Sequence, residues 1–415
     1  MNETANRAVA RPPSGRGALT LVVVVSLLNS MAAMIVVPVL PKLVETFTGD
    51  VGHAAQYVGA FAAMFALIQF LASPVLGALS DAFGRRAVIL ISAFGMAGDY
   101  VLMALAPSVG WLFVARMISG VTAASGPAVN AYIADAIPPE ERAGAFGWTG
   151  AAFAVGFLVG PSLGGVLGAV DPRLPFWVSG GLCMATALYG LFILPESLPK
   201  DRRTRFTFAR ANPWGAFRFL LDRPQLSGLV LVLMMMLVAS QCLPTTLVLY
   251  TDYRFGWSTG LVGAYLTFAG VGHLVVQSLL VRRSVSRFGE RNTAMIGYAS
   301  TAIGFVIYAS APVGWMFPVG MPFYALAGLV GPAVQSQLTR KVAATEQGRL
   351  QGSVAGLTAL TGLFAPILFT QLFAYATTGA GAGVAPPGLH LYVGAAVLAL
   401  GAVMAARLMR TEVPA

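Results

Sequence analysis

Hydrophobic residues occur in twelve long runs along the 415-residue chain, and short polar or basic stretches separate these runs. Each run holds roughly 20 residues, the length that a helix needs to cross the ~30 Å hydrocarbon core of a bilayer. Backbone groups in lipid must find hydrogen bonds within their own segment, so these runs are expected to be helices. The pattern predicts an all-α integral membrane protein with spans at residues 19–44, 56–78, 88–106, 111–133, 147–169, 175–194, 226–250, 258–281, 293–311, 314–337, 352–378 and 388–409.

Composition supports this class. Hydrophobic side chains make up 57% of the chain and charged ones only 10%, far from the balance of a soluble domain. The first run is expected to remain as a span, because other long runs follow it directly. Cys183 and Cys242 both lie inside apolar runs, which predicts small buried side chains and neither a redox pair nor a metal site.

Basic residues fall in alternate loops. Of the 26 lysines and arginines, 22 lie before the first span, at the C-terminus, or in the loops that follow even-numbered spans. The positive-inside rule then places both termini and the long basic loop in the cytoplasm of a cell whose inner membrane the chain crosses. Lipid headgroups account for cations beside spans, so no nucleic-acid partner is expected.

The chain also contains an internal repeat. A shift of 205 residues places "FGRR" (83–86) on "FGER" (288–291), Pro107 on Pro312, Glu141 on Glu346 and Pro161 on Pro366. Six helices followed by six in the same orientation predict two bundles related by an axis along the membrane normal. The expected domains are residues 1–194, a basic linker at 195–224, and residues 225–415.

Three motifs resemble signatures of the major facilitator superfamily. The first is "GALSDAFGRR" (77–86) between spans 2 and 3, in which Ala82 replaces the usual basic residue; the second is "RMISG" (116–120) in span 4. The third, "GFLVGPSLGG" (156–165) in span 5, resembles the motif of exporters that work by antiport. The alternatives are a charged turn that only anchors two helices and a tight but static helix pair. The residues expected to control conformation are Gly77, Asp81, Gly84, Arg85, Arg86, Gly156, Gly160, Pro161, Gly164 and Gly165.

The whole chain resembles the tetracycline efflux proteins more closely, with "LLNSMAAMIVVPVLPKL" in span 1, "GDYVLMAL" in span 3 and "GRLQGSVAGLTALTG" at the start of span 11. The resemblance implies that Asp99 handles substrate and protons, that Arg116 is the helix 4 arginine, and that His273 and Gln277 are a polar pair in helix 8. It also implies that a divalent cation can accompany the substrate. Two acids of that family are absent, because Asn29 and Thr301 stand at their positions.

Asp99 is the only acid that lies deep within a predicted span. A carboxylate there costs on the order of 3 kcal/mol, so such groups usually face a bundle interior or a water-filled cavity. Measured from the hairpin that joins spans 3 and 4, Asp99 and Arg116 can meet. Desolvation and a nearby guanidinium act on the carboxyl in opposite directions, which predicts a proton switch; a fixed ion pair joining the two helices is the alternative.

The sequence thus predicts proton-driven export of a small amphipathic compound by alternating access. The candidate substrate-binding residues are Asn29, Asp99, Gln241, His273 and Gln277, although their side chains could instead only join helices. No cofactor beyond the proton gradient is expected, and the chain is expected to work as a monomer. An importer or facilitator on the same fold is the main alternative, and a membrane enzyme is a weaker one, because no catalytic constellation is visible.

Overall fold

The computed structural model describes residues 15–124, 126–204, 223–343 and 346–409, and these residues form helices joined by turns. Most of the predicted linker at 195–224 lies outside the described residues. In chain order the elements are α1 (Gly15–Val36), α2 (Leu40–Thr48), α3 (Val51–Phe83), α4 (Arg85–Leu105), α5 (Val109–Ala123), α6 (Gly126–Ala136), α7 (Pro139–Val170), α8 (Leu174–Ile193), η1 (Lys200–Arg202), α10 (Pro224–Ser240), α11 (Cys242–Phe255), α12 (Thr259–Val275), η3 (Val276–Leu280), α13 (Val281–Ser310), η4 (Gly314–Gly320), α14 (Met321–Ala325), η5 (Leu326–Leu329), α15 (Val330–Arg340), α16 (Gln347–Thr377) and α17 (Leu389–Leu408).

The predicted fold class is confirmed. Eleven described segments are long and apolar enough to cross a membrane, and one of them, Thr259–Ser310, has 52 residues. A helix of that length would measure ~78 Å, more than twice the hydrocarbon thickness. Gly289, with φ 74° and ψ 168°, interrupts it. This segment therefore holds two of the twelve predicted spans.

Three of the predicted spans are broken near a proline. The first span ends as α1 before Pro38 and resumes as α2, and the seventh divides at Gln241, three residues before Pro244. Proline has no N–H and therefore leaves one carbonyl of the preceding turn without its helical partner. The fourth span divides into α5 and α6 in the same way before Pro127.

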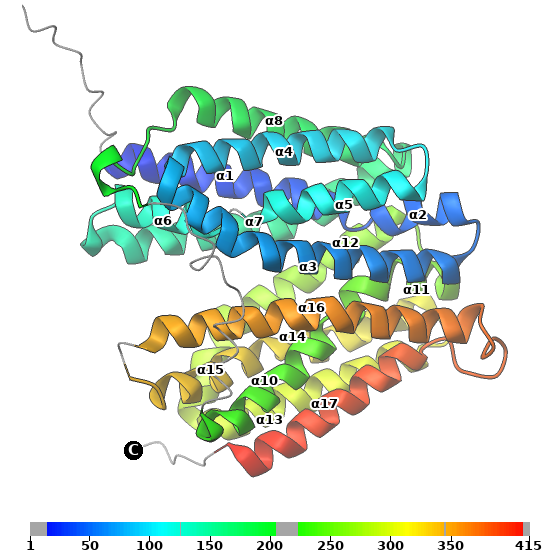
Figure 1. The fold of residues 1–415 in the computed structure, drawn as a ribbon. Coiled ribbons are helices and arrows are strands. Elements are labelled where there is room, and N and C mark those ends of the chain that lie inside the picture. The colour runs from blue at the N-terminus through cyan, green and yellow to red at the C-terminus, as the bar shows by residue number, and fades with distance from the viewer. Residues whose placement is uncertain (1–14, 125, 205–222, 344–345, 410–415) are drawn as a thin grey trace, which may run out of the picture.

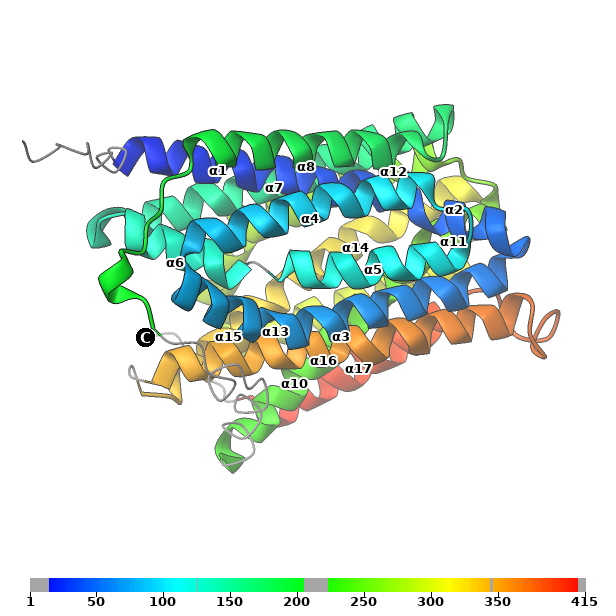
Figure 2. The same ribbon diagram turned by 45° about the horizontal axis from the view of Figure 1, so that its top comes forward.

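The helices form two layers (Figure 1), one made of α1 to α8 and the other of α10 to α17. Two ends of the molecule can be distinguished. We call the end with the turns at Gly84 and Gly289 the linker end, and the opposite end, with the α2–α3, α11–α12 and α16–α17 turns, the hairpin end (Figure 2). The 205-residue repeat is visible in three dimensions, because Gly84 and Gly289 both have positive φ, 108° and 74°.

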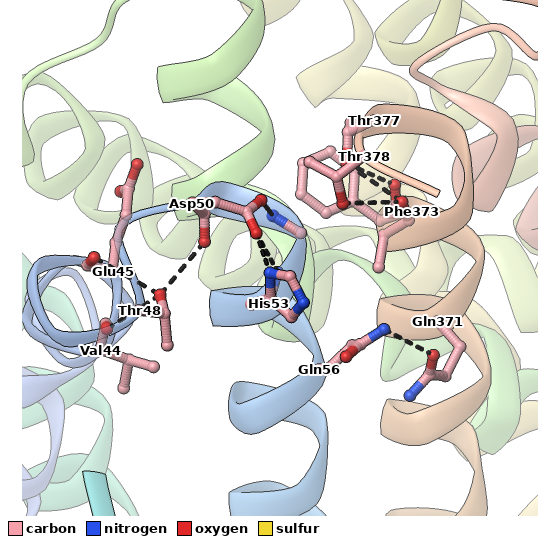
Figure 3. Close-up of polar contacts among 12 residues, drawn as sticks. Val44, Glu45, Thr48, Asp50, His53, Gln56, Gln371, Phe373, Thr377 and Thr378 are labelled. Carbon is pink, nitrogen blue, oxygen red and sulfur yellow. Dashed lines mark hydrogen bonds and ion pairs between the residues drawn. The ribbon is translucent and has the colours of Figure 1, made fainter. Parts of the chain in front are cut away.

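The two layers meet along two seams, α3 with α16 and α7 with α12. In the first seam the antiparallel helices touch at the hairpin end. A Cβ on Gly59 would lie 3.1 Å from the Cβ of Thr370, and Gly52 lies equally close against Thr378. Gln56 donates a hydrogen bond to Gln371 between these contacts, over 3.4 Å (Figure 3).

An ion pair also crosses between the layers at the hairpin end. Lys42 of α2 donates to Asp252 of α11 and, over 3.0 Å, to Glu45. Nearby, Asp50 caps α3 by accepting from the backbone N–H of Gly52 at 2.7 Å (Figure 3). Burial raises the pKa of the Asp50 carboxyl, but its hydrogen bonds outweigh this and hold the pKa below its usual range. The hairpin end is therefore closed by packing and by paired charges.

The glycine motif of α7 serves two contacts. Gly156, Gly160 and Gly164 face α1 within the first layer, and a Cβ on Gly164 would lie 1.9 Å from the Ile35 carbonyl oxygen. Gly165 faces the other way, where its Cβ would meet the Thr259 carbonyl oxygen of α12 at 2.5 Å. Glycine at this spacing lets backbones touch, so α7 is packed tightly on both sides.

A pair of alanine substitutions in α7 tests this packing. Gly164→Ala should lower the thermal unfolding temperature of the purified protein, because overpacking against backbone costs roughly 1–3 kcal/mol. Gly150→Ala on the same helix should leave that temperature unchanged or raise it slightly, because nothing lies within 4 Å of the added methyl group. Equal effects of the two substitutions would contradict the described α1–α7 contact.

A cysteine pair tests the α3–α16 seam. In the double variant Gly59→Cys with Thr370→Cys, the two Cβ atoms start close to disulfide distance, so mild oxidation should join the layers. A protease site placed in the connection between α8 and α10 allows detection, since only a cross-linked chain stays intact on a denaturing gel after cleavage.

The control combines Gly59→Cys with Gln351→Cys. Gln351 lies ~28 Å from Thr370 along α16, toward the start of the helix. The native Cys183 and Cys242 are fully buried and should not contribute. Cross-linking of the control but not of the test pair would show that the helices are arranged differently.

Candidate functional site

A cavity lies between the two layers on the linker side of the α3–α16 seam. Its volume is ≈590 Å³, within the range of drug-binding pockets. Aromatic, small and uncharged polar residues of three segments line it: Ala62, Phe65, Ala66, Gln69, Phe70, Ser73 and Pro74 of α3, Gln241 and Thr245 at the start of α11, and Gly352, Ala355, Gly356, Thr358, Ala359, Gly362 and Pro366 of α16. This cavity is the candidate substrate site.

Helix breaks position its two carboxamides. Gln241 is the single residue between α10 and α11, where Pro244 interrupts the span. Gln69 donates from Nε2 to the Ala123 carbonyl over 3.4 Å, at the point where Pro127 cannot supply a helical N–H. Gln241 is one of the predicted binding residues, whereas Gln69 was not predicted, although it is a lone amide in the middle of an apolar span.

Asp99 does not line this cavity. Its side chain is 2% exposed on α4, and one carboxylate oxygen accepts a hydrogen bond from Ser119 of α5. The other oxygen is buried and has no hydrogen-bond partner among the described residues. A carboxylate so enclosed can change its protonation state only if hydration or helix packing around it changes.

The fixed Asp99–Arg116 ion pair, the alternative to a proton switch, is not formed in this structure. Arg116 donates instead to the Met103 sulfur over 3.0 Å, and its guanidinium carbon lies 5.9 Å from the centre of the Phe65 ring. The reason is one of register. Asp99 precedes Pro107 by ~12 Å of helix while Arg116 follows Trp111 by ~7.5 Å, so Arg116 lies about one turn nearer the hairpin end. Phe65 both lines the cavity and contacts Arg116, and it connects the two sites.

The other predicted binding residues face separate, smaller cavities. Asn29 lines a space of ≈40 Å³ inside the first layer, and its Oδ1 is buried without a described partner. His273 and Gln277 line a groove of ≈290 Å³ on the α7–α12 seam. His273 also faces a cavity of ≈120 Å³ that includes Thr301, whose hydroxyl donates to the Gly297 carbonyl. The structure therefore does not bring the predicted residues together in one site, and their roles remain predictions.

The "GALSDAFGRR" motif forms a charged cluster at the linker end. Arg85 pairs with Asp81 and with Asp135, and its backbone N–H donates to Glu196 over 2.9 Å. Gly84 has positive φ, and a Cβ there would collide with Glu196. Arg85 is only 9% exposed, because the two acids and the turn at Gly84 enclose it. Gly77 lies in α3, and Arg86 donates to the Leu191 carbonyl over 2.7 Å.

The second layer repeats one ion pair of this cluster with opposite charges. At the 205-residue shift, Glu290 replaces Arg85 and Arg340 replaces Asp135, and these two residues again form an ion pair. A further pair, Arg223 with Glu346, joins the start of α10 to the start of α16. The Arg223 guanidinium holds the pKa of the Glu346 carboxyl below its usual range. Extending the repeat alignment by these positions would have found the sign reversal in the sequence.

Comparisons with known proteins agree with this geometry. The "Tetracycline resistance protein, class C" of Escherichia coli is 38% identical over 84% of this chain and 87% of its own length. The "Tetracycline resistance protein, class G" of Vibrio anguillarum is 36% identical over 85% of this chain and 89% of its own. Among solved structures, a bacterial homologue of the human lysosomal transporter Spinster superposes with a TM-score of 0.75, at 18% identity and over 96% of this chain and 98% of that one. The family model described as Major Facilitator Superfamily matches residues 22–366, so the chain belongs to the major facilitator superfamily.

Proposed function

We propose that this chain exports a small amphipathic drug-like compound in exchange for protons. The observation that carries the proposal is a cavity of ≈590 Å³ that lies between two six-span layers closed at the hairpin end. The relatives named as tetracycline resistance proteins, at 36–38% identity over most of both chains, support drug export. Because the chain belongs to a transporter superfamily, we set aside the membrane-enzyme alternative.

The distribution of basic residues supports placing the linker end in the cytoplasm of an inner membrane. The structure then corresponds to a state that is closed to the outside. Opening to the outside requires that Lys42 separates from Asp252 and that the glycine contacts at the hairpin end part. The linker ends of the two layers would approach each other in the same movement, as alternating access demands.

We further propose that Asp99 couples this movement to the proton. It is the buried acid of α4, and its hydrogen bond to Ser119 joins α4 to α5. A rearrangement that moves Arg116 by one turn relative to α4 would bring its guanidinium beside the carboxylate and favour release of the proton. Phe65 passes such a shift on to the cavity, because it touches both.

Inverted membrane vesicles test the coupling. When the vesicle interior is more acidic than the medium, Asp99→Asn should reduce substrate accumulation inside the vesicles by at least tenfold. Exchange of labelled for unlabelled substrate without a pH gradient should continue. The reason is that an amide preserves the shape of the side chain but cannot gain or lose a proton. The measurement is uptake of a fluorescent or labelled drug at matched expression.

Asp201→Asn serves as the matched control, because Asp201 is an exposed acid in η1, outside the predicted spans. Wild-type coupling in Asp99→Asn would remove Asp99 from the mechanism. Substrate movement out of inverted vesicles, instead of into them, would favour the importer alternative. The site is enclosed by the two layers of one chain, which supports function as a monomer.

A further inference from the structure

The lining of the main cavity contains no charged side chain among the residues that the structure describes. Its polar groups are the carboxamides of Gln69 and Gln241 and the hydroxyls of Ser73, Thr245 and Thr358. A bare cation placed there would lose its hydration without gaining a counter-charge, which costs several kcal/mol. Magnesium and calcium require oxygen ligands that usually include carboxylates, and the cavity wall supplies none.

The polar groups that remain are suited to a neutral ligand. Thr245 donates its hydroxyl proton to the backbone carbonyl of Gln241 over 2.7 Å, and Thr358 donates to the backbone carbonyl of Val354 over 3.0 Å. Both hydroxyls can therefore only accept further hydrogen bonds. Gln69 uses one N–H of its Nε2 on the Ala123 carbonyl and keeps a second N–H and a side-chain carbonyl oxygen. Gln241 keeps both a donor and an acceptor on a side chain that borders the cavity.

Packing holds Gln241 in this position. Gly362 of α16 lies between Gln241 and Ala66 of α3, and a Cβ there would be 3.3 Å from Gln241 Nε2 and from the Ala66 methyl group. The glycine therefore allows the carboxamide to reach the place where the two layers meet. Gln69 belongs to the first layer and Gln241 to the second, so a ligand that binds both is held by both layers.

The buried acid Asp99 lies outside this lining. Asp99 of α4 accepts a hydrogen bond from Ser119 of α5. The positively charged guanidinium of Arg116 lies 5.9 Å from the centre of the Phe65 ring. The charge that lies beside the cavity-lining Phe65 is therefore positive, which disfavours a cation in the cavity.

We propose that the cavity binds an uncharged compound carrying amide, carbonyl or hydroxyl groups, and that Gln69 and Gln241 determine this specificity. The proposal rests on the proposed export function and names its substrate class. It replaces the expectations that Asp99 contacts the substrate and that a divalent cation can accompany the substrate. Coupling to the proton is then indirect, through Arg116 and Phe65.

Equilibrium binding to the full-length protein in lipid nanodiscs tests the proposal without requiring transport. The probes are chloramphenicol, which is uncharged and carries an amide and two aliphatic hydroxyls, tetraphenylphosphonium, a permanent lipophilic cation, and tetracycline with and without Mg²⁺. We expect saturable binding of chloramphenicol that is independent of Mg²⁺, and little or no binding of tetraphenylphosphonium. Saturable binding of the cation, or tetracycline binding that needs Mg²⁺, together with no binding of chloramphenicol, would overturn the proposal.

Substitutions locate the binding. Gln241→Leu and Gln69→Leu should each weaken chloramphenicol binding about five- to tenfold, the effect of one lost hydrogen bond. Gln241→Asn should retain part of the affinity, and Gln241→Glu should bind tetraphenylphosphonium more tightly than wild type. The matched control is Gln351→Leu, an exposed glutamine on α16 that is absent from the described lining. An effect of the control equal to that of Gln69→Leu and Gln241→Leu would contradict the assigned site.

Uptake driven by a pH gradient, measured with the same probes, separates this proposal from the proposed function. Binding of chloramphenicol without proton-driven movement of any probe would leave the cavity assignment intact and refute the export mechanism. Proton-driven movement of tetraphenylphosphonium but not of chloramphenicol would do the reverse.

Discussion

The close contacts that glycines allow between helices at the hairpin end are the constraint on which the rest of the structure depends. Gly165 and Gly263 let α7 touch α12, and Gly52 and Gly59 let α3 touch α16. Helices in lipid gain little from the hydrophobic effect when they associate, so close packing and polar contacts must hold them together. Both seams are closed by such contacts at one end, and each widens into a cavity toward the other. The location of the candidate substrate site follows from this asymmetry.

Charged groups are placed according to the cost of burying them. Lys42, Asp252 and Glu45 satisfy one another at the hairpin end, and Arg85 is enclosed by two acids at the linker end. Between these ends, Asp99 and Arg116 each keep a buried polar atom without a described partner. Incomplete satisfaction is expensive in a low-dielectric interior. A small movement of Asp99 relative to Arg116 can therefore change the free energy of the protein substantially.

The sequence was sufficient to predict the fold and the repeat, because the length of an apolar run and a constant 205-residue offset do not depend on how helices rotate. It was not sufficient to predict the site. Asn29, His273 and Gln241 lie in three different cavities because the position of a residue along a span does not determine which way its side chain faces. The numbers of residues between the α4–α5 hairpin and Asp99 or Arg116 already imply an offset of about one helical turn. Because an arginine side chain is long enough to span one turn, the sequence alone could not show that the two groups stay apart. The prolines at 38, 127 and 244 can be read in the sequence. That the breaks at Pro127 and Pro244 position Gln69 and Gln241 is seen only in the tertiary structure.

The reversed ion pairs Arg85–Asp135 and Glu290–Arg340 have a consequence for the history of the chain. If the two layers descend from one duplicated ancestor, exchange of the two signs in one copy could not proceed through a single substitution without placing two like charges side by side. Such an intermediate would be unstable, so the two changes must have been nearly simultaneous or bridged by a neutral residue. The reversal also prevents exchange of single helices between the two halves. If α13 replaced α4, for example, Glu290 would lie beside Asp135, and two like charges would repel where two opposite charges now attract.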